Sequence, residues 1–190
     1  MSSSEPKPPA AATAACTYWC PMPGIPEIQA EAVKAAAAAA AAAGQPPPPT
    51  SATYPGGCHC GYLAFEVTLT PPLDQGHMVI HCNCSACRRF GYLLVYPERA
   101  NMRWRNPGGQ SRCATYRFNT GLQEHLFCPR CGASVGIDFL QRFGPDLDRY
   151  GVNACALNNI NVDTLTLQKL DGLNLIQPAG DLSGQASTKE

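Results

Sequence analysis

The sequence carries little charge, and its charges cancel. Charged residues make up 15% of the 190 residues, and 14 lysines and arginines are balanced by 14 aspartates and glutamates. Proteins that bind nucleic acid or anionic membranes usually carry an excess of basic residues, because phosphate groups attract them. The even balance therefore argues against both kinds of partner, and we expect neither nucleic acid nor a membrane.

Long apolar runs are missing as well. No stretch approaches the roughly 18 to 20 apolar residues that span a bilayer, and the alanine run at 35–43 is short and soon followed by prolines. The first residues lack the basic start and leucine-rich core of a secretory signal. The first arginine in the chain is Arg88, which argues against an arginine-rich mitochondrial presequence. We expect a cytoplasmic protein, with the nucleus as the alternative location.

Residues 1–55 form a low-complexity region rich in alanine and proline. Within it, Glu27–Ala43 is predicted to be helical, because alanine is the best helix former and a glycine and prolines follow. This helix has no substantial apolar face, so we expect a tail that is disordered or partly helical. Cys16 and Cys20 lie in this tail with C-x3-C spacing, which alone is a weak metal signal, and we assign them no role.

The chain from Cys58 onward consists of short segments rich in β-branched and aromatic residues, separated by glycine and proline. This texture predicts a mostly β fold of packed antiparallel sheets, in a single domain over residues 56–173. A flexible C-terminal tail is expected at 174–190. The predicted strands are Tyr62–Leu69, Met78–His81, Leu93–Tyr96, Met102–Arg105, Ala114–Phe118, Glu124–Phe127, Ser134–Asp138 and Gly151–Ala156.

The chain contains 11 cysteines, an odd number. In a reducing compartment, closely spaced cysteines are more often metal ligands than disulfide partners. We therefore expect a zinc-stabilised domain. The clustered cysteines form three groups, which are Cys58 with Cys60, Cys82 with Cys84 and Cys87, and Cys128 with Cys131.

The first and third groups together suit a closed zinc site. Cys128 and Cys131 have the spacing of a zinc knuckle, in which two thiolates on a tight turn share one metal. Cys58 and Cys60 would point to the same side of an extended chain, because side chains alternate along a strand. Four thiolates leave no open coordination position, so this site is expected to be structural.

The middle group has three cysteines and no obvious fourth ligand. Cys82 and Cys84 share a strand face, and Cys87 could return from the first turn of a short helix that begins just after Cys84. Three protein ligands and one exchangeable position are the layout of a reactive zinc. Backbone amides at the helix start and the cations Arg88 and Arg89 would help to keep the thiolates ionised. The two arginines could also do no more than balance the thiolate charge.

Other assignments remain open at this point. The ligands of the two sites could be exchanged between groups. The middle site could also be closed, and made inert, by His81, His59 or His125. None of the three is favoured, since on a strand His81 would face away from its neighbour Cys82, and His59 and His125 are more often simple polar strand residues. Cys113 and Cys155 lie in strand-like segments, where a buried cysteine usually acts as a small apolar residue.

Four motifs together are similar to those of a known family. The motifs are GGCHCGYLAFEV at 56–67, CNCSACRRFG at 82–91, EHLFCPRCG at 124–132 and GVNACAL at 151–157. In order and spacing they resemble the family of glutathione-dependent formaldehyde-activating enzyme and centromere protein V. The resemblance covers residues 55–173, including YRF at 116–118 and the acidic residue Asp171.

The resemblance implies a function and a set of metal ligands. The family activity is of the carbon–sulfur lyase type, in which formaldehyde and glutathione condense to S-hydroxymethylglutathione or are released from it. The resemblance also implies glutathione as co-substrate and two zinc ions per chain. The structural zinc maps onto Cys58, Cys60, Cys128 and Cys131, and the catalytic zinc onto Cys82, Cys84 and Cys87.

Two points concern the partners of the domain. Arg88 or Arg89 could pair with a carboxylate of glutathione. The alternative to an enzyme is a non-catalytic, zinc-stabilised module that binds a protein partner. Nothing in the sequence indicates an oligomeric state.

Because the tail has little apolar surface to contribute to a core, deleting residues 1–50 should leave zinc content and thermal stability unchanged. Elemental analysis and thermal unfolding of the truncated and full chains would check this expectation. A loss of either property would mean that the tail is part of the folded unit.

Overall fold

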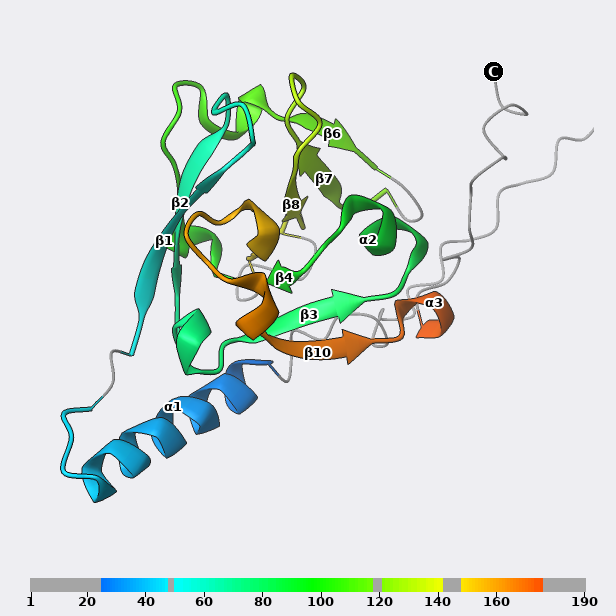
Figure 1. Ribbon diagram of the computed structural model, residues 1–190. Helices are drawn as coiled ribbons and strands as arrows, with labels where there is room; N and C mark the ends of the chain where they lie inside the picture. Colours follow the sequence, from blue (N-terminus) through cyan, green and yellow to red (C-terminus); the bar gives the residue numbers. More distant parts are fainter. Residues whose placement is uncertain (1–24, 48–49, 118–120, 142–147, 176–190) are drawn as a thin grey trace, which may run out of the picture.

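The computed structural model describes residues 25–47, 50–117, 121–141 and 148–175 (Figure 1). Cys16, Cys20, Phe118 and nearly all of the predicted C-terminal tail lie outside these ranges. Within them, no helix combines the length and apolar character needed to cross a membrane.

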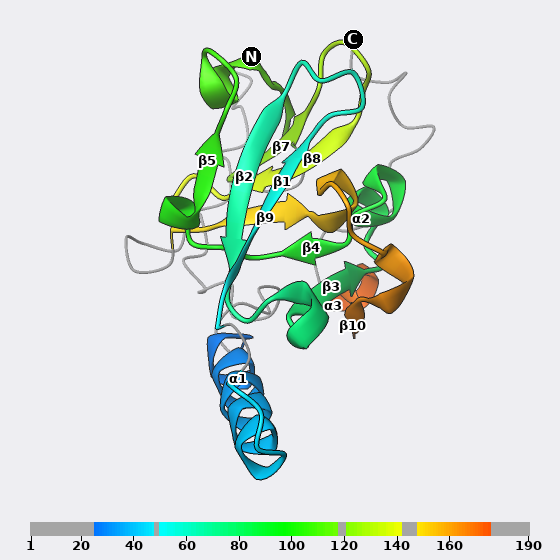
Figure 2. The ribbon, with the colours of Figure 1, turned by 60° about the vertical axis from the view of Figure 1, so that its left-hand side comes forward.

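Two β-sheets make up most of the domain. The three-stranded antiparallel sheet has the order β1-β2-β5, with bounds Ala52–Gly57, Ala64–Leu69 and Met102–Trp104. It lies in front of the other sheet in Figure 2. The seven-stranded sheet has the order β10-β3-β4-β9-β8-β7-β6. Its strands are β3 (Met78–Cys82), β4 (Leu94–Val95), β6 (Ala114–Tyr116), β7 (Glu124–Phe127), β8 (Ser134–Asp138), β9 (Tyr150–Asn153) and β10 (Thr166–Leu170).

The mostly β prediction is confirmed, with one difference in strand direction. All described pairs of neighbouring strands are antiparallel except β10 and β3, which run parallel, so the larger sheet is mixed. Each predicted strand overlaps an observed one, but the strand predicted at Gly151–Ala156 ends early. The side chain of Asn153 accepts a hydrogen bond from the Cys155 amide there and begins a 3₁₀ turn.

Two strands were not predicted, for different reasons. β1 contains Pro55, Gly56 and Gly57, residues that are unfavourable inside most strands. It lies at the edge of its sheet, where a missing amide donor is tolerated. β10 is exposed along most of its length, so it has no buried face to produce an alternating pattern.

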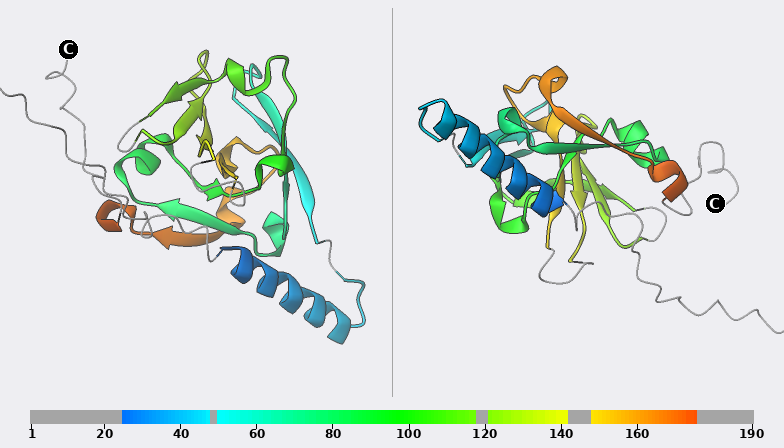
Figure 3. Two further views of the ribbon diagram at one scale, coloured as in Figure 1. Left: turned by 180° about the vertical axis from the view of Figure 1, so that it is seen from behind. Right: turned by 90° about the horizontal axis from the view of Figure 1, so that it is seen from below.

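The helices are few and peripheral. α1 spans Ile25–Ala42, close to the predicted helix, and projects away from the sheets (Figures 1 and 3). α2 spans Ser85–Phe90 and α3 spans Gly172–Leu175. Short 3₁₀ turns are η2 (Leu73–Gln75), η3 (Arg99–Asn101), η4 (Gly109–Arg112), η6 (Ala154–Ala156) and η7 (Val162–Thr164).

The core consists of two apolar clusters on opposite faces of the seven-stranded sheet. Adjacent residues of β3, Val79 and Ile80, belong to different clusters, as strand alternation requires. The first cluster fills the space between the sheets and contains Phe65 and Val67 from β2. Each such buried side chain contributes roughly 1.5 to 3 kcal/mol. The second cluster lies under α2 and includes Cys82, Cys84 and Cys87, together with Ile80, Ala86, Tyr92, Leu94, Ile137 and Phe139.

One ion-pair network connects several chain segments at the edge of the core. The Arg99 guanidinium donates hydrogen bonds to Asp138 at 2.5 and 3.2 Å and to Asp148 at 2.7 Å. Gln110 donates to Asp138 at 2.7 Å and accepts from the Tyr150 hydroxyl. Burial by itself would raise the pKa of Asp138, but the hydrogen bonds from Arg99 and Gln110 outweigh it and lower the pKa. Asp138 is therefore an ionised carboxylate that depends on these donors.

Arg99→Ala should destabilise the domain by about 2 to 4 kcal/mol, because it leaves the buried Asp138 carboxylate without its main partner. Urea unfolding of the zinc-saturated protein, followed by circular dichroism, measures the change. Arg103→Ala is the matched control, because the Arg103–Glu66 pair is exposed and screened by solvent, and its loss should change the free energy of unfolding much less. Equal effects of the two substitutions would contradict this assignment.

Candidate metal centres

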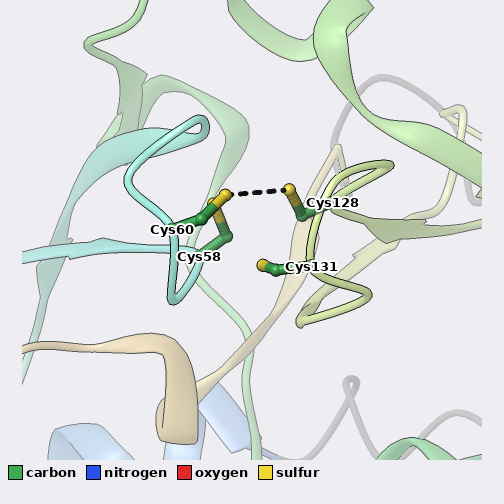
Figure 4. A group of neighbouring side chains, drawn as sticks. All are labelled: Cys58, Cys60, Cys128 and Cys131. Carbon is green, nitrogen blue, oxygen red and sulfur yellow. Dashed lines mark hydrogen bonds between the residues drawn. The ribbon is translucent and has the colours of Figure 1, made fainter.

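Four cysteine side chains from two hairpin turns meet at one point (Figure 4). Cys58 and Cys60 lie just after β1, in the turn that leads to β2, and Cys128 and Cys131 lie between β7 and β8. All four sulfur atoms are within 4.8 Å of one another. The Sγ–Sγ distances are 3.6 Å from Cys58 to Cys60 and 3.7 Å from Cys60 to Cys128.

These distances suit a tetrahedral zinc ion. With zinc–sulfur bonds near 2.3 Å, neighbouring sulfurs of a tetrahedron lie about 3.8 Å apart. The donor set and its spacing therefore fit zinc. The local backbone differs from the sequence-based expectation, because Cys58–Cys60 enters a tight turn instead of an extended chain. Gly61 and Gly132, which follow the two cysteine pairs, adopt φ angles of 75° and 72° that favour glycine.

Backbone amides donate hydrogen bonds to the sulfurs of this four-cysteine cluster. The Leu63 amide donates to the Cys58 sulfur at 3.1 Å, and the Arg130 amide donates to the Cys128 sulfur at 3.4 Å. The guanidinium carbons of Arg112 and Arg130 lie 3.6 and 3.8 Å from the centroid of the Tyr62 ring. The two amide hydrogen bonds favour ionised sulfurs, and the two arginines pack against the Tyr62 ring in the same turn region.

The second cluster is formed by Cys82, Cys84 and Cys87 at the junction of β3 and α2. Cys82 ends β3, and Cys84 is the N-cap of α2, accepting a hydrogen bond at 3.5 Å from the Cys87 amide. The helix ends at Gly91 in the left-handed conformation. The three sulfur atoms lie within 4.8 Å of one another. As expected, Cys87 lies in the first turn of a short helix and its sulfur joins those of Cys82 and Cys84.

The three thiols cannot all ionise in the metal-free protein. Hydrogen bonds from Cys82 and Cys87 hold the pKa of Cys84 well below its ordinary value. The same contacts, together with burial, raise the pKa of Cys82 and Cys87. The cluster thus holds one thiolate and two thiols, and metal binding would release the two remaining protons. Soft thiolate ligands of this kind fit zinc.

The structure shows where the three histidines considered as a fourth ligand of the middle cluster lie. Among the described residues, no His, Asp or Glu side chain joins either cysteine cluster. His81 is exposed on the outer side of β3, and His59 is exposed in the turn after β1. His125 is buried in β7. The alternatives that close the middle site with a histidine are therefore not supported.

His125 belongs instead to an aromatic stack that the sequence did not indicate. Its ring lies 5.3 Å from that of Phe90 and 5.8 Å from that of Tyr92, measured between centroids. The Tyr92 hydroxyl donates to the Gly136 carbonyl at 2.9 Å, so it accepts the 3.2 Å hydrogen bond from His125 Nδ1. Burial lowers the pKa of His125 to about 4. His125 is thus neutral with its proton on Nδ1, and its ring packs against Phe90 at the end of α2.

Arg88 and Arg89 lie on the exposed side of α2. The Arg89 guanidinium donates to the Ser85 carbonyl at 3.0 Å, within its own helix. Their cations lie in the last turn of this short helix, where positive charge is favourable. This placement is compatible with the predicted role of the two arginines in balancing the thiolate charge. It does not show a contact between either arginine and glutathione.

A cavity of about 510 Å³ lies between the four-cysteine cluster and the end of α2. Cys58, His59, Phe90 and Cys155 are among its lining residues, whereas Cys82, Cys84 and Cys87 are not. Cys155 is exposed, so its expected role as a buried apolar residue was wrong. The 3₁₀ turn at Ala154–Ala156 turns its side chain out of the core.

Metal-free protein should show a wide spread of thiol reactivity. Backbone amides of Ala133 and Cys60 lower the pKa of Cys131 to about 6, and burial raises the pKa of Cys113 to about 12. Since the thiolate is the reactive form, iodoacetamide should modify Cys131 at pH 7 at least about 100-fold faster than Cys113. The Cys131 rate should rise with pH through 6 and level off above about 7. Peptide mass spectrometry follows both, and bound zinc should protect Cys131. Similar rates at the two positions would contradict the assignment.

Comparison with known proteins places these clusters in a family. Residues 53–162, more than half of the chain, match the family described as glutathione-dependent formaldehyde-activating enzyme. Among solved structures, the chain is similar to a crystallised Rhodobacter sphaeroides protein, with 31% identity over 57% of this chain and 92% of that chain, and a TM-score of 0.47. The family is one of enzymes, and its described substrates are small molecules. The resemblance indicated by the cysteine motifs is confirmed, and the chain belongs to the family of glutathione-dependent formaldehyde-activating enzymes.

Proposed function

We propose that this protein is a zinc-dependent carbon–sulfur lyase that acts on an adduct of glutathione, or another thiol, with an aldehyde such as formaldehyde. The observation that carries the proposal is the convergence of three cysteine sulfurs, at positions 82, 84 and 87, on one point. No fourth His, Cys, Asp or Glu ligand completes this group among the described residues. Three protein ligands leave one coordination position for a substrate.

The donor set suits thiol chemistry. A zinc ion held by three thiolates is a soft, mild Lewis acid that binds a further thiolate readily and generates hydroxide poorly. Cys82, Cys84 and Cys87 would hold it, and the amide of Cys87 would keep Cys84 ionised. In the synthetic direction, the glutathione thiol gives up its proton, and its sulfur forms a bond to the formaldehyde carbon. The carbonyl electron pair moves to oxygen, which takes up one proton, and the reverse reaction breaks the same carbon–sulfur bond.

The remaining assignments follow the same proposal. Cys58, Cys60, Cys128 and Cys131 would hold a second, structural zinc ion, since four thiolates leave no open position. Arg88 and Arg89 would pair with a carboxylate of glutathione at the end of α2. Charge reversal of both arginines that leaves the affinity for glutathione intact would remove them from the site.

A second candidate function is favoured by one observation. Cys82, Cys84 and Cys87 expose 4%, 2% and 7% of their surface, as expected for a metal site enclosed by protein. A zinc ion there could stabilise the domain without reacting, and the domain would then be a module that binds a protein partner. The two functions differ in whether a small thiol can reach the middle cluster.

Metal content of the wild type and of Cys84→Ser distinguishes the two functions. For the enzyme, elemental analysis should give two zinc ions per wild-type chain and one per variant chain, with the variant still folded. Glutathione should perturb a cobalt-substituted wild-type protein, in the absorption bands of the thiolate-bound metal, and leave the variant unchanged. Exchange of formaldehyde with glutathione, followed by NMR, should fall to the uncatalysed rate in the variant.

Cys155→Ser is the matched control, since it removes an exposed thiol outside both clusters. It should keep both zinc ions and the exchange activity. One zinc ion in the wild type, or unfolding of Cys84→Ser, would favour the structural role of the middle cluster and hence the binding module.

A further inference from the structure

Asn83 lies between two cysteines of the middle cluster and faces the opposite way. Because side chains alternate along an extended chain, Cys82 and Cys84 point into the core while Asn83 points outward. Burial agrees, since both cysteines are buried and Asn83 is exposed. Its side chain is therefore available to contacts from outside the cluster.

Those contacts come from the C-terminal segment, residues 166–174, which comprises β10 and most of α3. β10 runs beside β3 and leads directly into α3 (Figure 1). In this parallel pair Leu170 is in register with Cys82, and Leu170 also packs against the apolar cluster that contains the three cysteines. The segment lies beyond residues 53–162, the part matched by the family.

Asn83 uses three polar groups toward this segment. Its backbone amide donates to the Leu170 carbonyl at 3.1 Å, which continues the β3–β10 pairing by one residue. Its side-chain amide donates to Asp171 at 2.9 Å, and its side-chain oxygen accepts from the Leu173 backbone amide at 2.8 Å. Asn83 and Asp171 are 88 residues apart in the sequence.

Asp171 is itself held in place. Its second carboxylate oxygen accepts a hydrogen bond from Asn174 at 2.6 Å. Hydrogen bonds from Asn174 and then Asn83 lower the pKa of Asp171, so an ionised acceptor faces Asn83 at neutral pH. Charge-assisted hydrogen bonds of this kind are stronger than neutral ones and more directional.

We propose that Asn83 is a positioning residue for the three-cysteine cluster and that the C-terminal segment is part of the functional unit. Three hydrogen bonds to one residue restrict both its backbone and its side chain. The residues on either side, Cys82 and Cys84, are two of the three candidate ligands. The segment thereby sets the spacing of their sulfur atoms from the outside of the sheet. This inference rests on the proposed zinc site at the middle cluster.

The chemistry of the pair allows a sharp test. Asn83→Asp keeps the shape of the side chain but removes the donor and places a second carboxylate against Asp171. Asp171→Asn alone leaves two amides facing each other, which can still form a weaker hydrogen bond. The double variant restores an amide facing a carboxylate with the direction of the hydrogen bond reversed. The oxygen that accepts from the Leu173 amide is retained, and the net charge equals that of the wild type.

The measurement is zinc release from the full-length, zinc-loaded protein to a chromophoric chelator. Cys84→Ser identifies the phase that belongs to the middle cluster. Loss of a residue that orients metal ligands typically costs about 10- to 100-fold in metal affinity. Asn83→Asp should speed that phase by about the same factor and leave the four-cysteine phase unchanged. The double variant should return to within about threefold of the wild type.

Asp163→Asn is the control, because it removes an exposed carboxylate of η7 and should change neither phase. Thermal unfolding separates a local effect from a global one. An unchanged middle-cluster phase in Asn83→Asp, acceleration of both phases with a loss of thermal stability, or failure of the double variant to recover would each overturn the proposal.

Failure of the zinc assignment is a separate outcome. If the wild type holds no zinc at the middle cluster, the proposed function fails, and Asn83 is tested by alkylation of the full-length protein as purified, with the metal of the four-cysteine cluster left in place. Asn83→Asp should then increase the rate at which iodoacetamide modifies Cys84, with recovery in the double variant. Equal Cys84 rates in the wild type and Asn83→Asp would overturn the positioning role as well.

Discussion

Sulfur atoms from two different sheets meet at the four-cysteine cluster, and the packing of the domain depends on how their charge is balanced. Cys58 and Cys60 belong to the hairpin of the three-stranded sheet, and Cys128 and Cys131 to a hairpin of the seven-stranded sheet. Four thiolates within 4.8 Å repel one another unless a cation lies between them. A metal ion bound there would join the two sheets directly, beside the apolar cluster that fills the space between them. Zinc binding and folding are coupled in such sites.

The middle cluster depends on a different environment. Its cysteines belong to an apolar cluster under α2, with His125 and Tyr92 stacked against Phe90 at the end of that helix. Burial of three sulfurs favours a tightly held metal, whereas the absence of a fourth ligand among the described residues favours reactivity. The four-cysteine cluster differs in both respects, because it has four ligands and two of them, Cys60 and Cys131, are exposed. At the middle cluster, burial thus favours a structural metal, whereas the number of ligands favours a reactive one. Metal content and thiol binding together distinguish the two roles.

Much of the local structure could be predicted because it depends on short-range geometry. Cys84, Ser85 and Cys87 specify an N-cap and the first turn of a helix, and the observed helix begins at Ser85. β7 and β8 were predicted with their observed bounds because their residues alternate or are β-branched. β1 and β10 were missed because proline, glycine and exposure remove those signals. The exposed position of Cys155 depends on a turn started by Asn153, which resembles a continuing strand in the sequence.

The sequence by itself determined the three cysteine groups, since ligand spacing along a chain is a local property, and the family motifs indicated how these groups divide between two sites. The tertiary structure decided which residues surround them. His125 stacks on α2, Arg89 hydrogen-bonds within its own helix, and Asp171 reaches Asn83 across 88 positions. Such contacts join segments that are distant along the chain, and they form only when strand pairing and core packing bring those segments together. Patterns of neighbouring residues in the sequence therefore do not reveal these contacts.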